Sequence, residues 1–140
     1  FHRTLLDSLR AIPGVRGAAV SSGIPFGNGA YTTTPIVTIG QSALPPEAAV
    51  PTDWRFVSPG YFKAMSIPLL QGREFVDGDM PSTAPLTVIV SQTTAQRFWG
   101  DTDPIGRILH RQGDLARQYT VVGVVGDTRG SDGTARGSTA

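Results

Sequence analysis

The stretch T-D-W-R-F-V-S-P-G-Y-F-K-A-M-S-I-P-L-L-Q-G-R-E-F, residues 52–75, decides the fold. Aromatic and charged residues alternate over residues 52–57, which is the period of a strand. Ser58 and Pro59 then predict a helix N-cap with proline at the first helical position. Pro68 ends this helix, because the residue before a proline avoids helical geometry. The expected apolar side of the helix consists of Tyr61, Phe62 and Met65.

A second strand and helix follow further along the chain. Leu86–Val90 is an apolar run, and Ser91 can cap a helix that ends at Gly100. A turn over residues 112–114 then predicts a hairpin into Tyr119–Val125, the strongest strand in the sequence. The buried face of the helix is expected to carry Ala95, Phe98 and Trp99.

The N-terminal part has a different texture. Residues Thr4–Ile12 have leucines at one-turn spacing and predict an amphipathic helix, which Pro13-Gly14 ends. Val15–Val20 is a short strand candidate. Residues 23–51, rich in Gly, Pro and Thr, predict short strands and loops in a β-rich insertion.

The sum predicts an α+β fold with a mixed sheet. Two strand-helix-strand units, Thr52–Leu70 and Leu86–Val125, form the sheet, beside the smaller β-rich part. We expect one domain over residues 1–126. Residues 127–140 contain three Gly and no large apolar residue, which predicts a flexible or truncated tail.

Composition excludes several classes of function. The chain has 140 residues, a formal net charge of +1 and no Cys. Its charges are spread without runs, which disfavours a nucleic-acid partner, and the missing Cys removes thiolate catalysis. No apolar stretch approaches the roughly 18 to 20 residues of a membrane span. The chain opens without Met, so we expect a fragment whose parent carries any membrane segments.

Candidate catalytic and metal-binding residues are few. A Ser-His-Asp triad would depend on His110, and no Gly-x-Ser-x-Gly sequence accompanies it. The acidic group Glu74, Asp77 and Asp79 has oxygen ligands for Ca²⁺ but lacks the EF-hand spacing. The remaining close pair, Asp101 and Asp103, precedes Pro104 and is typical of an Asx turn.

Two further patterns have structural explanations. Residues 123–130 are glycine-rich after a strand, but they match neither the dinucleotide fingerprint nor the P-loop. The aromatic residues lack interleaved basic residues and are interpreted as core rather than as a stacking platform: Trp54, Tyr61, Phe62, Phe98 and Trp99. We therefore expect no catalytic, cofactor-binding or metal-binding residue and predict that the chain is not an enzyme.

Seven short motifs occur in order along the chain: VSPGYF at 57–62, IPLL at 67–70, GR at 72–73, VIVS at 88–91, AQRFW at 95–99, DPIGR at 103–107 and YTVVGVVGD at 119–127. This ordered set resembles the MacB-like periplasmic core domains of FtsX-like ABC transporter permeases, especially those with duplicated halves. The resemblance covers about Asp53 to Arg129, and the start of the chain with Gly23-Ile24-Pro25 also fits.

The resemblance implies a porter-like, non-catalytic domain on the periplasmic side of the bacterial cytoplasmic membrane. It implies a cytoplasmic ABC ATPase as an indirect partner, with a second permease copy and a periplasmic adaptor or carrier as further partners. In such proteins the domain couples cytoplasmic ATP hydrolysis to substrate export or partner docking. The family usually continues from the Gly-Asp-x-Arg turn into another apolar strand and helix, which residues 132–140 lack.

Two other functions stay open from the sequence. The chain could be an extracytoplasmic ligand-binding or sensor domain of a membrane receptor, for which an apolar pocket with convergent polar groups is typical. It could also be a secreted hydrolase that uses acidic residues such as Asp77 and Asp79.

Overall fold

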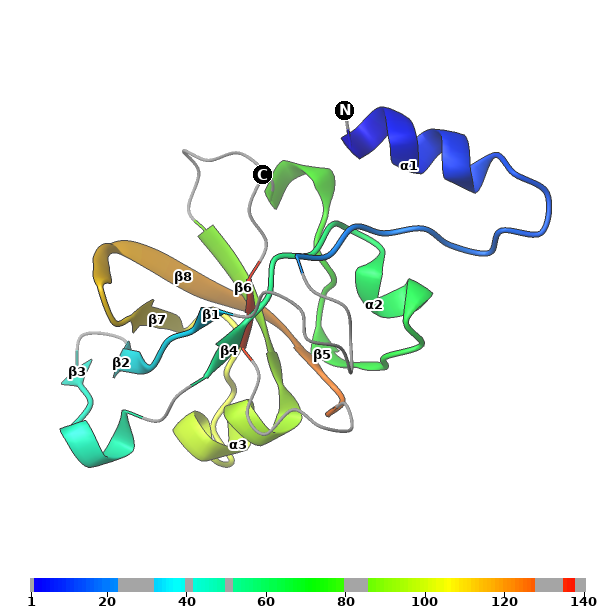
Figure 1. The fold of residues 1–140 in the computed structure, drawn as a ribbon. Coiled ribbons are helices and arrows are strands. Elements are labelled where there is room, and N and C mark those ends of the chain that lie inside the picture. Colours follow the sequence, from blue (N-terminus) through cyan, green and yellow to red (C-terminus); the bar gives the residue numbers. More distant parts are fainter. Residues whose placement is uncertain are drawn as a thin grey trace.

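Strand β8 (Asp114–Val125) is the strand around which the sheet is organised in this computed structural model (Figure 1). It pairs in parallel with β6 (Leu86–Ser91). On its other side it pairs antiparallel with β7 (Ile108–Arg111) and then with β5 (Leu69–Gly72). The structure describes residues 2–22, 32–39, 42–49, 52–79, 86–127 and 135–137.

The sheet has seven strands, with β5 beside the path β3-β2-β7-β8-β6-β9. Parallel and antiparallel pairs occur together, as the predicted mixed sheet requires. The hairpin from β7 into β8 confirms the predicted turn at residues 112–114. The outer strands are β2 (Ile36–Ile39), β3 (Ser42–Ala43) and β9 (Ala135–Gly137), while β1 (Thr32–Thr33) and β4 (Asp53–Trp54) form a separate two-stranded sheet.

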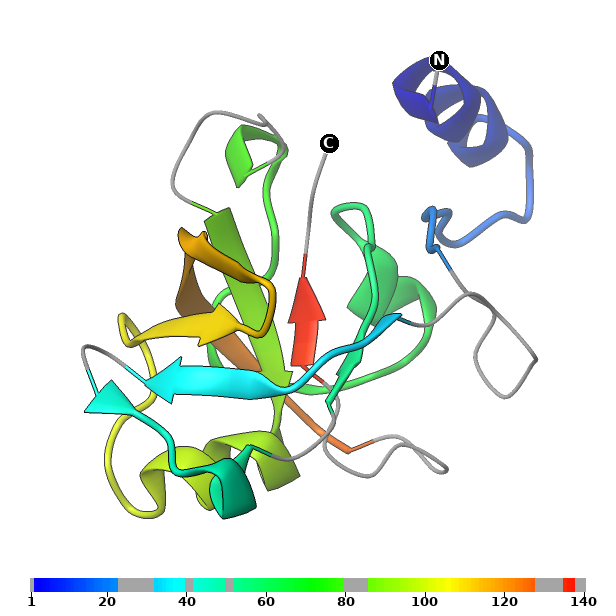
Figure 2. The same cartoon turned by 60° about the vertical axis from the view of Figure 1, so that its left-hand side comes forward.

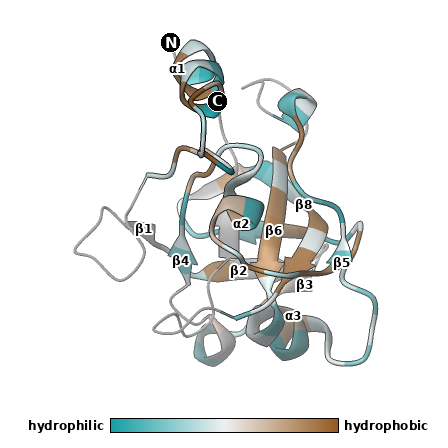
Figure 3. Cartoon of the chain, turned by 90° about the vertical axis from the view of Figure 1, so that its right-hand side faces the viewer, coloured by the Kyte–Doolittle hydropathy of each residue, from teal (hydrophilic) through white to brown (hydrophobic). Residues whose placement is uncertain are grey.

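Both faces of the sheet are covered, so β6 is buried at every position. Its side chains alternate between two cores: Val88 and Val90 lie in the first, and Ile89 lies in the second. Helix α3 (Gln92–Trp99) contributes to the first core and helix α2 (Tyr61–Ala64) to the second. Figure 3 shows this continuous apolar strand at the centre of the fold.

A bulge in β8 shifts its alternation. Val88 pairs with Val121, but the next residue, Ile89, pairs with Gly123, so Val122 is an extra residue. As a result, Val121 and Val124 both lie in the first core, although three positions separate them.

The backbones of β5 and β8 approach closely at this bulge. Gly72, at φ +74°, pairs with Gly123, and a Cβ on Gly72 would overlap the carbonyl oxygen of Val122. A Cβ on Gly123 would overlap the carbonyl oxygen of Arg73. The two glycines therefore allow β5 to lie against the bulge, and no larger residue fits at either position without movement of the backbone.

Helix α3 is attached to the sheet at its first turn. The Ser91 hydroxyl accepts a hydrogen bond from the Thr94 amide at 3.3 Å, which confirms the predicted cap. The Asp127 carboxylate, just beyond β8, accepts from the Thr93 amide at 3.0 Å and from its hydroxyl at 2.6 Å. Asp127 thus supplies the negative charge that the first turn of the helix lacks.

The buried face of α3 differs in part from the prediction. Ala95 is buried, and Thr94, which was not predicted, is fully buried beside it. Phe98 and Trp99 are only partly buried and pack against the edge of the first core.

The predicted cap of α2 is wrong. Gly60, at φ +86°, precedes the helix instead of Ser58. The Ser58 hydroxyl instead accepts a hydrogen bond from the Val20 amide at 2.8 Å. This bond gives the backbone N–H of Val20, which is not in a helix or strand, a partner. Tyr61 is buried as predicted, whereas Met65 is exposed.

Helix α1 (His2–Arg10) confirms the predicted N-terminal helix with a shift of two residues. Val15–Val20 is extended but is not assigned as a strand, since only one isolated bridge, Ser21 to Val57, follows it. The helix stands apart from the sheet and buries only Leu6 among its residues (Figures 1 and 2).

The two predicted strand-helix-strand units have different outcomes. In the second, β6, α3 and β8 form a parallel crossover as predicted. In the first, β4 and β5 belong to different sheets, because β4 pairs with β1 and β5 pairs with β8.

Two segments predicted from composition contribute to the sheets. Within residues 23–51, the described strands β2 and β3 extend the main sheet through β7, and residues 46–48 form the 3-10 helix η1 (Pro46–Ala48). Within the predicted tail, β9 pairs antiparallel with β6. Residues 135–137 thus form a strand although they carry no large apolar side chain; residues 128–134 and 138–140 lie outside the described part.

An ion pair holds the turn after β5. The two terminal nitrogens of Arg73, Nη1 and Nη2, donate to the Asp79 carboxylate at 2.7 and 3.0 Å, and the Val76 amide donates to it at 2.8 Å. Asp79 lies in the 3-10 helix η2 (Asp77–Asp79) and is buried, whereas the Arg73 side chain is half exposed. The hydrogen bonds from Arg73, opposed by burial, hold the pKa of Asp79 below its usual value.

The replacement Gly123→Ala should destabilise the chain by about 1 to 3 kcal/mol, because its Cβ meets the Arg73 carbonyl oxygen. Chemical denaturation measures the free energy of unfolding. Gly78→Ala is the matched control, since a Cβ there meets nothing and its φ is not left-handed; we expect a change within about 0.5 kcal/mol. Equal effects of the two substitutions would contradict the close approach.

The replacement Asp79→Asn should destabilise the chain by about 1 to 2 kcal/mol at pH 7, since the partner arginine is half exposed. The pKa of Asp79 is lower in the folded state, so its stabilisation is complete above the unfolded pKa of about 3.9 and fades as pH falls below that value. The difference in free energy of unfolding between wild type and variant should shrink as the pH falls from the unfolded pKa through the lower folded-state pKa of Asp79. Asp77→Asn, in an exposed pair with Arg3, should change stability by less than about 0.5 kcal/mol.

Candidate functional site

His110, on which a Ser-His-Asp triad would depend, lies in β7 and is half buried. Its Nδ1 is buried and has no hydrogen-bond partner in the described part of the chain. A triad needs a carboxylate on this nitrogen, so His110 is not placed as a catalytic base.

The three acidic residues after β5 do not converge on a common point. Asp79 is held by Arg73, and Asp77 pairs with Arg3 of α1 at 3.0 Å. Across residues 2–22, 32–39, 42–49, 52–79, 86–127 and 135–137, no three His, Asp or Glu side chains are grouped as metal ligands would be. Two of the three carboxylates are therefore used in ion pairs.

The glycine-rich exit from β8 has structural contacts. Gly126 lies against Pro68, where a Cβ would be 3.0 Å from the proline ring, and its amide donates to the Pro68 carbonyl at 2.9 Å. The Asp127 carboxylate accepts the hydrogen bond of the Thr93 amide in the first turn of α3. A phosphate at this helix end would meet a carboxylate, which agrees with the interpretation of this stretch as a strand exit.

The aromatic residues belong to the cores as predicted, with Phe98 and Trp99 at the edge. Trp54 packs against Tyr119 with ring centroids 5.1 Å apart, and the Arg111 guanidinium lies 5.6 Å from the Trp54 ring. Tyr61 and Phe62 meet edge to face on the opposite side of the sheet. These rings stabilise the two cores and are not available for stacking on a base.

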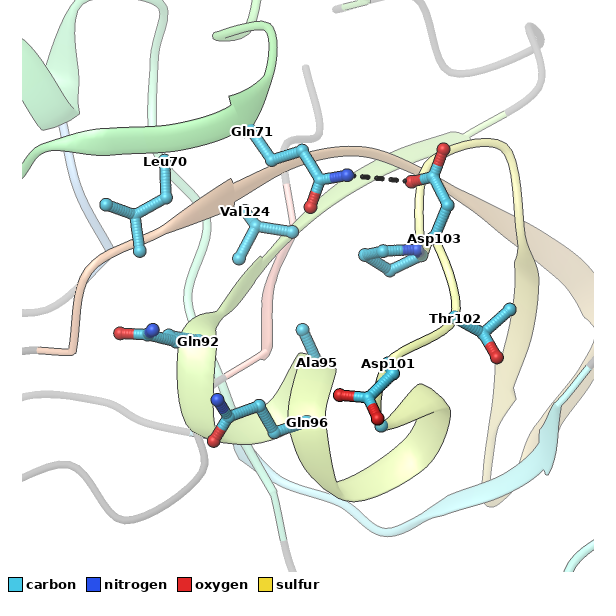
Figure 4. A pocket seen from close by; sticks show the side chains of 11 residues that line it. Leu70, Gln71, Gln92, Ala95, Gln96, Asp101, Thr102, Asp103 and Val124 are labelled. Atoms are coloured by element: carbon cyan, nitrogen blue, oxygen red, sulfur yellow. Dashed lines mark hydrogen bonds between the residues drawn. The ribbon is translucent and has the colours of Figure 1, made fainter.

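A pocket of about 360 Å³ lies between β5, α3 and the loop after α3 (Figure 4). Its floor is formed by Ala95, Pro104 and Val124, all buried. Carboxylates and carboxamides line its sides, and Gln71 donates a hydrogen bond to Asp103 at 2.9 Å across it. The polar lining residues are Gln71, Gln92, Gln96, Asp101, Thr102 and Asp103.

The sequence indicated only one part of this pocket. Asp103 accepts the Ile105 amide at 3.0 Å, which confirms the Asx turn. No sequence pattern indicated that Gln71, Gln92 and Gln96 line a pocket. They belong to β5 and to α3, and only the tertiary fold brings these two elements together.

A second pocket, of about 490 Å³, lies beneath α1. Its lining mixes Leu6 and Pro59 with Arg3, Arg10 and Asp77. Arg3 bonds to Asp77, and Arg10 donates to the Ala18 carbonyl at 3.0 Å, so both arginines are engaged in attaching α1. The outer side of the helix exposes Leu5 and Leu9.

Solved structures of transport proteins share this fold. The periplasmic region of MacB from Actinobacillus actinomycetemcomitans aligns with a TM-score of 0.66 and 14% identity, over 99% of this chain and 55% of that one. The extracellular domain of the noncanonic ABC-type transporter YknZ from Gram-positive bacteria gives 0.62 and 20%, over 99% and 62%. A domain of a putative permease protein from Porphyromonas gingivalis gives 0.62 and 16%, over 96% and 55%.

These likenesses establish the fold, and the chain spans between about half and two thirds of the length of those domains. None of the helices in the described ranges is long and apolar enough to cross a membrane. A comparison with curated proteins finds no match.

The family model of the MacB-like periplasmic core domain matches residues 2–139, nearly the whole chain. Its match extends over both halves of the mixed sheet, over α1 and over the pocket described above. The resemblance inferred from the ordered motifs is thus confirmed, and the chain belongs to the MacB-like periplasmic core domain family.

Proposed function

We propose that this chain is an extracytoplasmic, non-catalytic domain of an ABC transporter permease. In this proposal it couples ATP hydrolysis by a cytoplasmic ATPase to substrate export or to the docking of a periplasmic adaptor or carrier. The observation that carries the proposal is the family match over residues 2–139. A second permease copy is a further proposed partner.

The structure supports a mechanical role through the way its side chains are used. Arg73 and Asp79 fix the turn after β5, and Asp127 fixes α3 to the end of β8. The central strands carry two cores on opposite faces. A sheet that is packed on both faces deforms little and therefore transmits displacement as a unit.

A role as an extracytoplasmic ligand-binding or sensor domain is the second candidate. It is favoured by the pocket above Ala95 and Val124, which combines an apolar floor with convergent polar groups. The hydrolase alternative has less support, because Asp77 and Asp79 are both engaged in ion pairs with arginines.

The side of the membrane can be tested by cysteine labelling, since the chain contains no Cys. A Leu115→Cys variant of the full-length parent, free of other cysteines, should react with a membrane-impermeant maleimide in intact spheroplasts. Leu115 is 64% exposed at the hairpin between β7 and β8, so its thiol is accessible.

Val121→Cys is the control for folding, because Val121 is fully buried and its thiol should react only after denaturation. Labelling of Leu115→Cys only after the membrane is permeabilised would place the domain in the cytoplasm and refute the proposal.

A further inference from the structure

The pocket between β5 and α3 has an electrostatic character that the mechanical proposal does not use. Asp101 and Asp103 lie on its loop side, and none of its lining residues is Lys or Arg. Asp101 has no hydrogen-bond or ion-pair partner in the described part of the chain. Arg107, the neighbouring cation, donates to the backbone carbonyl of Asp103 at 3.2 Å and not to its carboxylate.

The end of α3 adds to this negative character. The helix ends at Trp99, and the loop over residues 100–104 continues along the pocket. The last carbonyl groups of a helix carry partial negative charge, which favours cations near them. Asp101 lies two residues beyond this helix end, so its carboxylate adds to the partial negative charge of the C-terminus of α3.

The remaining lining suits an aliphatic chain that carries a cation. The floor of the pocket is buried and apolar and consists of Ala95, Pro104 and Val124. Leu70 is half exposed at the opposite side. The side-chain oxygens of Gln92 and Gln96 can accept from N–H donors (Figure 4). An apolar floor with acceptors around it matches a methylene stem that ends in several N–H groups.

We propose that this pocket binds a guanidinium or alkylammonium group on an aliphatic stem, with its charged end at Asp101 and Asp103. Such a group is carried by an arginine or lysine side chain of a polypeptide or by a free small amine. The inference goes beyond the proposed function and does not depend on it.

Titration of the full chain with agmatine, followed by NMR, tests the proposal. The side-chain amide signals of Gln71 and Gln96 should shift saturably, with a Kd on the order of 1 mM, as expected for a single exposed cation site.

Acetyl-Leu-Arg-amide is the second probe, and acetyl-Leu-citrulline-amide is its uncharged control. A dipeptide that binds at least about tenfold more tightly than agmatine identifies a polypeptide source, since Leu70 then contacts the added leucine; equal affinities identify a free amine.

Two variants show whether the carboxylates are responsible. Asp101→Asn with Asp103→Asn keeps an acceptor for the Ile105 amide and should raise the Kd about tenfold. Gln96→Lys, at an exposed helical position, places a cation in the pocket and should abolish the shift of the Gln71 side-chain amide signals, which remain observable in this variant. Glu47→Gln removes an exposed carboxylate that does not line the pocket and should leave the Kd unchanged.

Three results overturn the proposal: no saturable shift with either cationic probe, equal binding of the citrulline control, or unchanged affinity in the double variant. Unchanged amide spectra away from the pocket establish that each variant is folded.

Discussion

The close backbone contact between β5 and β8 is the constraint on which the rest of the structure depends. Gly72 and Gly123 allow the two strands to pair at the bulge of β8. The bulge in turn sets which residues of β8 enter each core, because the extra residue Val122 shifts the alternation of side chains. The same contact starts the turn that Arg73 and Asp79 hold. A substitution at either glycine is therefore expected to disturb the two cores, the turn after β5 and the β5 side of the pocket.

Much of this arrangement could be predicted from local sequence. The strands predicted at 86–90 and 119–125, the Ser91 cap and the hairpin turn at 112–114 each depend on patterns within a few residues, and all are found, although β8 begins at Asp114, five residues before the prediction. The cap of α2 could not be predicted, because Ser58 is bonded to Val20, 38 residues away in sequence. Strand β9 has no apolar signal at all, since backbone pairing with β6 orders it.

The pocket illustrates the same limit for function. Asp101 and Asp103 are recognisable as turn residues, but Gln71 and Gln96 join them only after β5 has paired with β8 and α3 has packed on the sheet. Conversely, two of the three acidic residues that most resembled a site in sequence form ion pairs: Asp77 pairs with Arg3 of α1, and Asp79 pairs with Arg73 after β5. Spacing along the chain identified carboxylates, and tertiary contacts decided which of them remain available.

In the proposed coupling role, the sheet moves as one body without deforming. Hydrogen exchange of the full-length parent in membranes, with and without a non-hydrolysable ATP analogue, tests this claim most directly. We expect the amides of β6 and of the second half of β8 to exchange slowly in both states, since they are paired and lie between two cores. A loss of protection in these strands when nucleotide binds would contradict it, because the domain would then respond by opening its sheet.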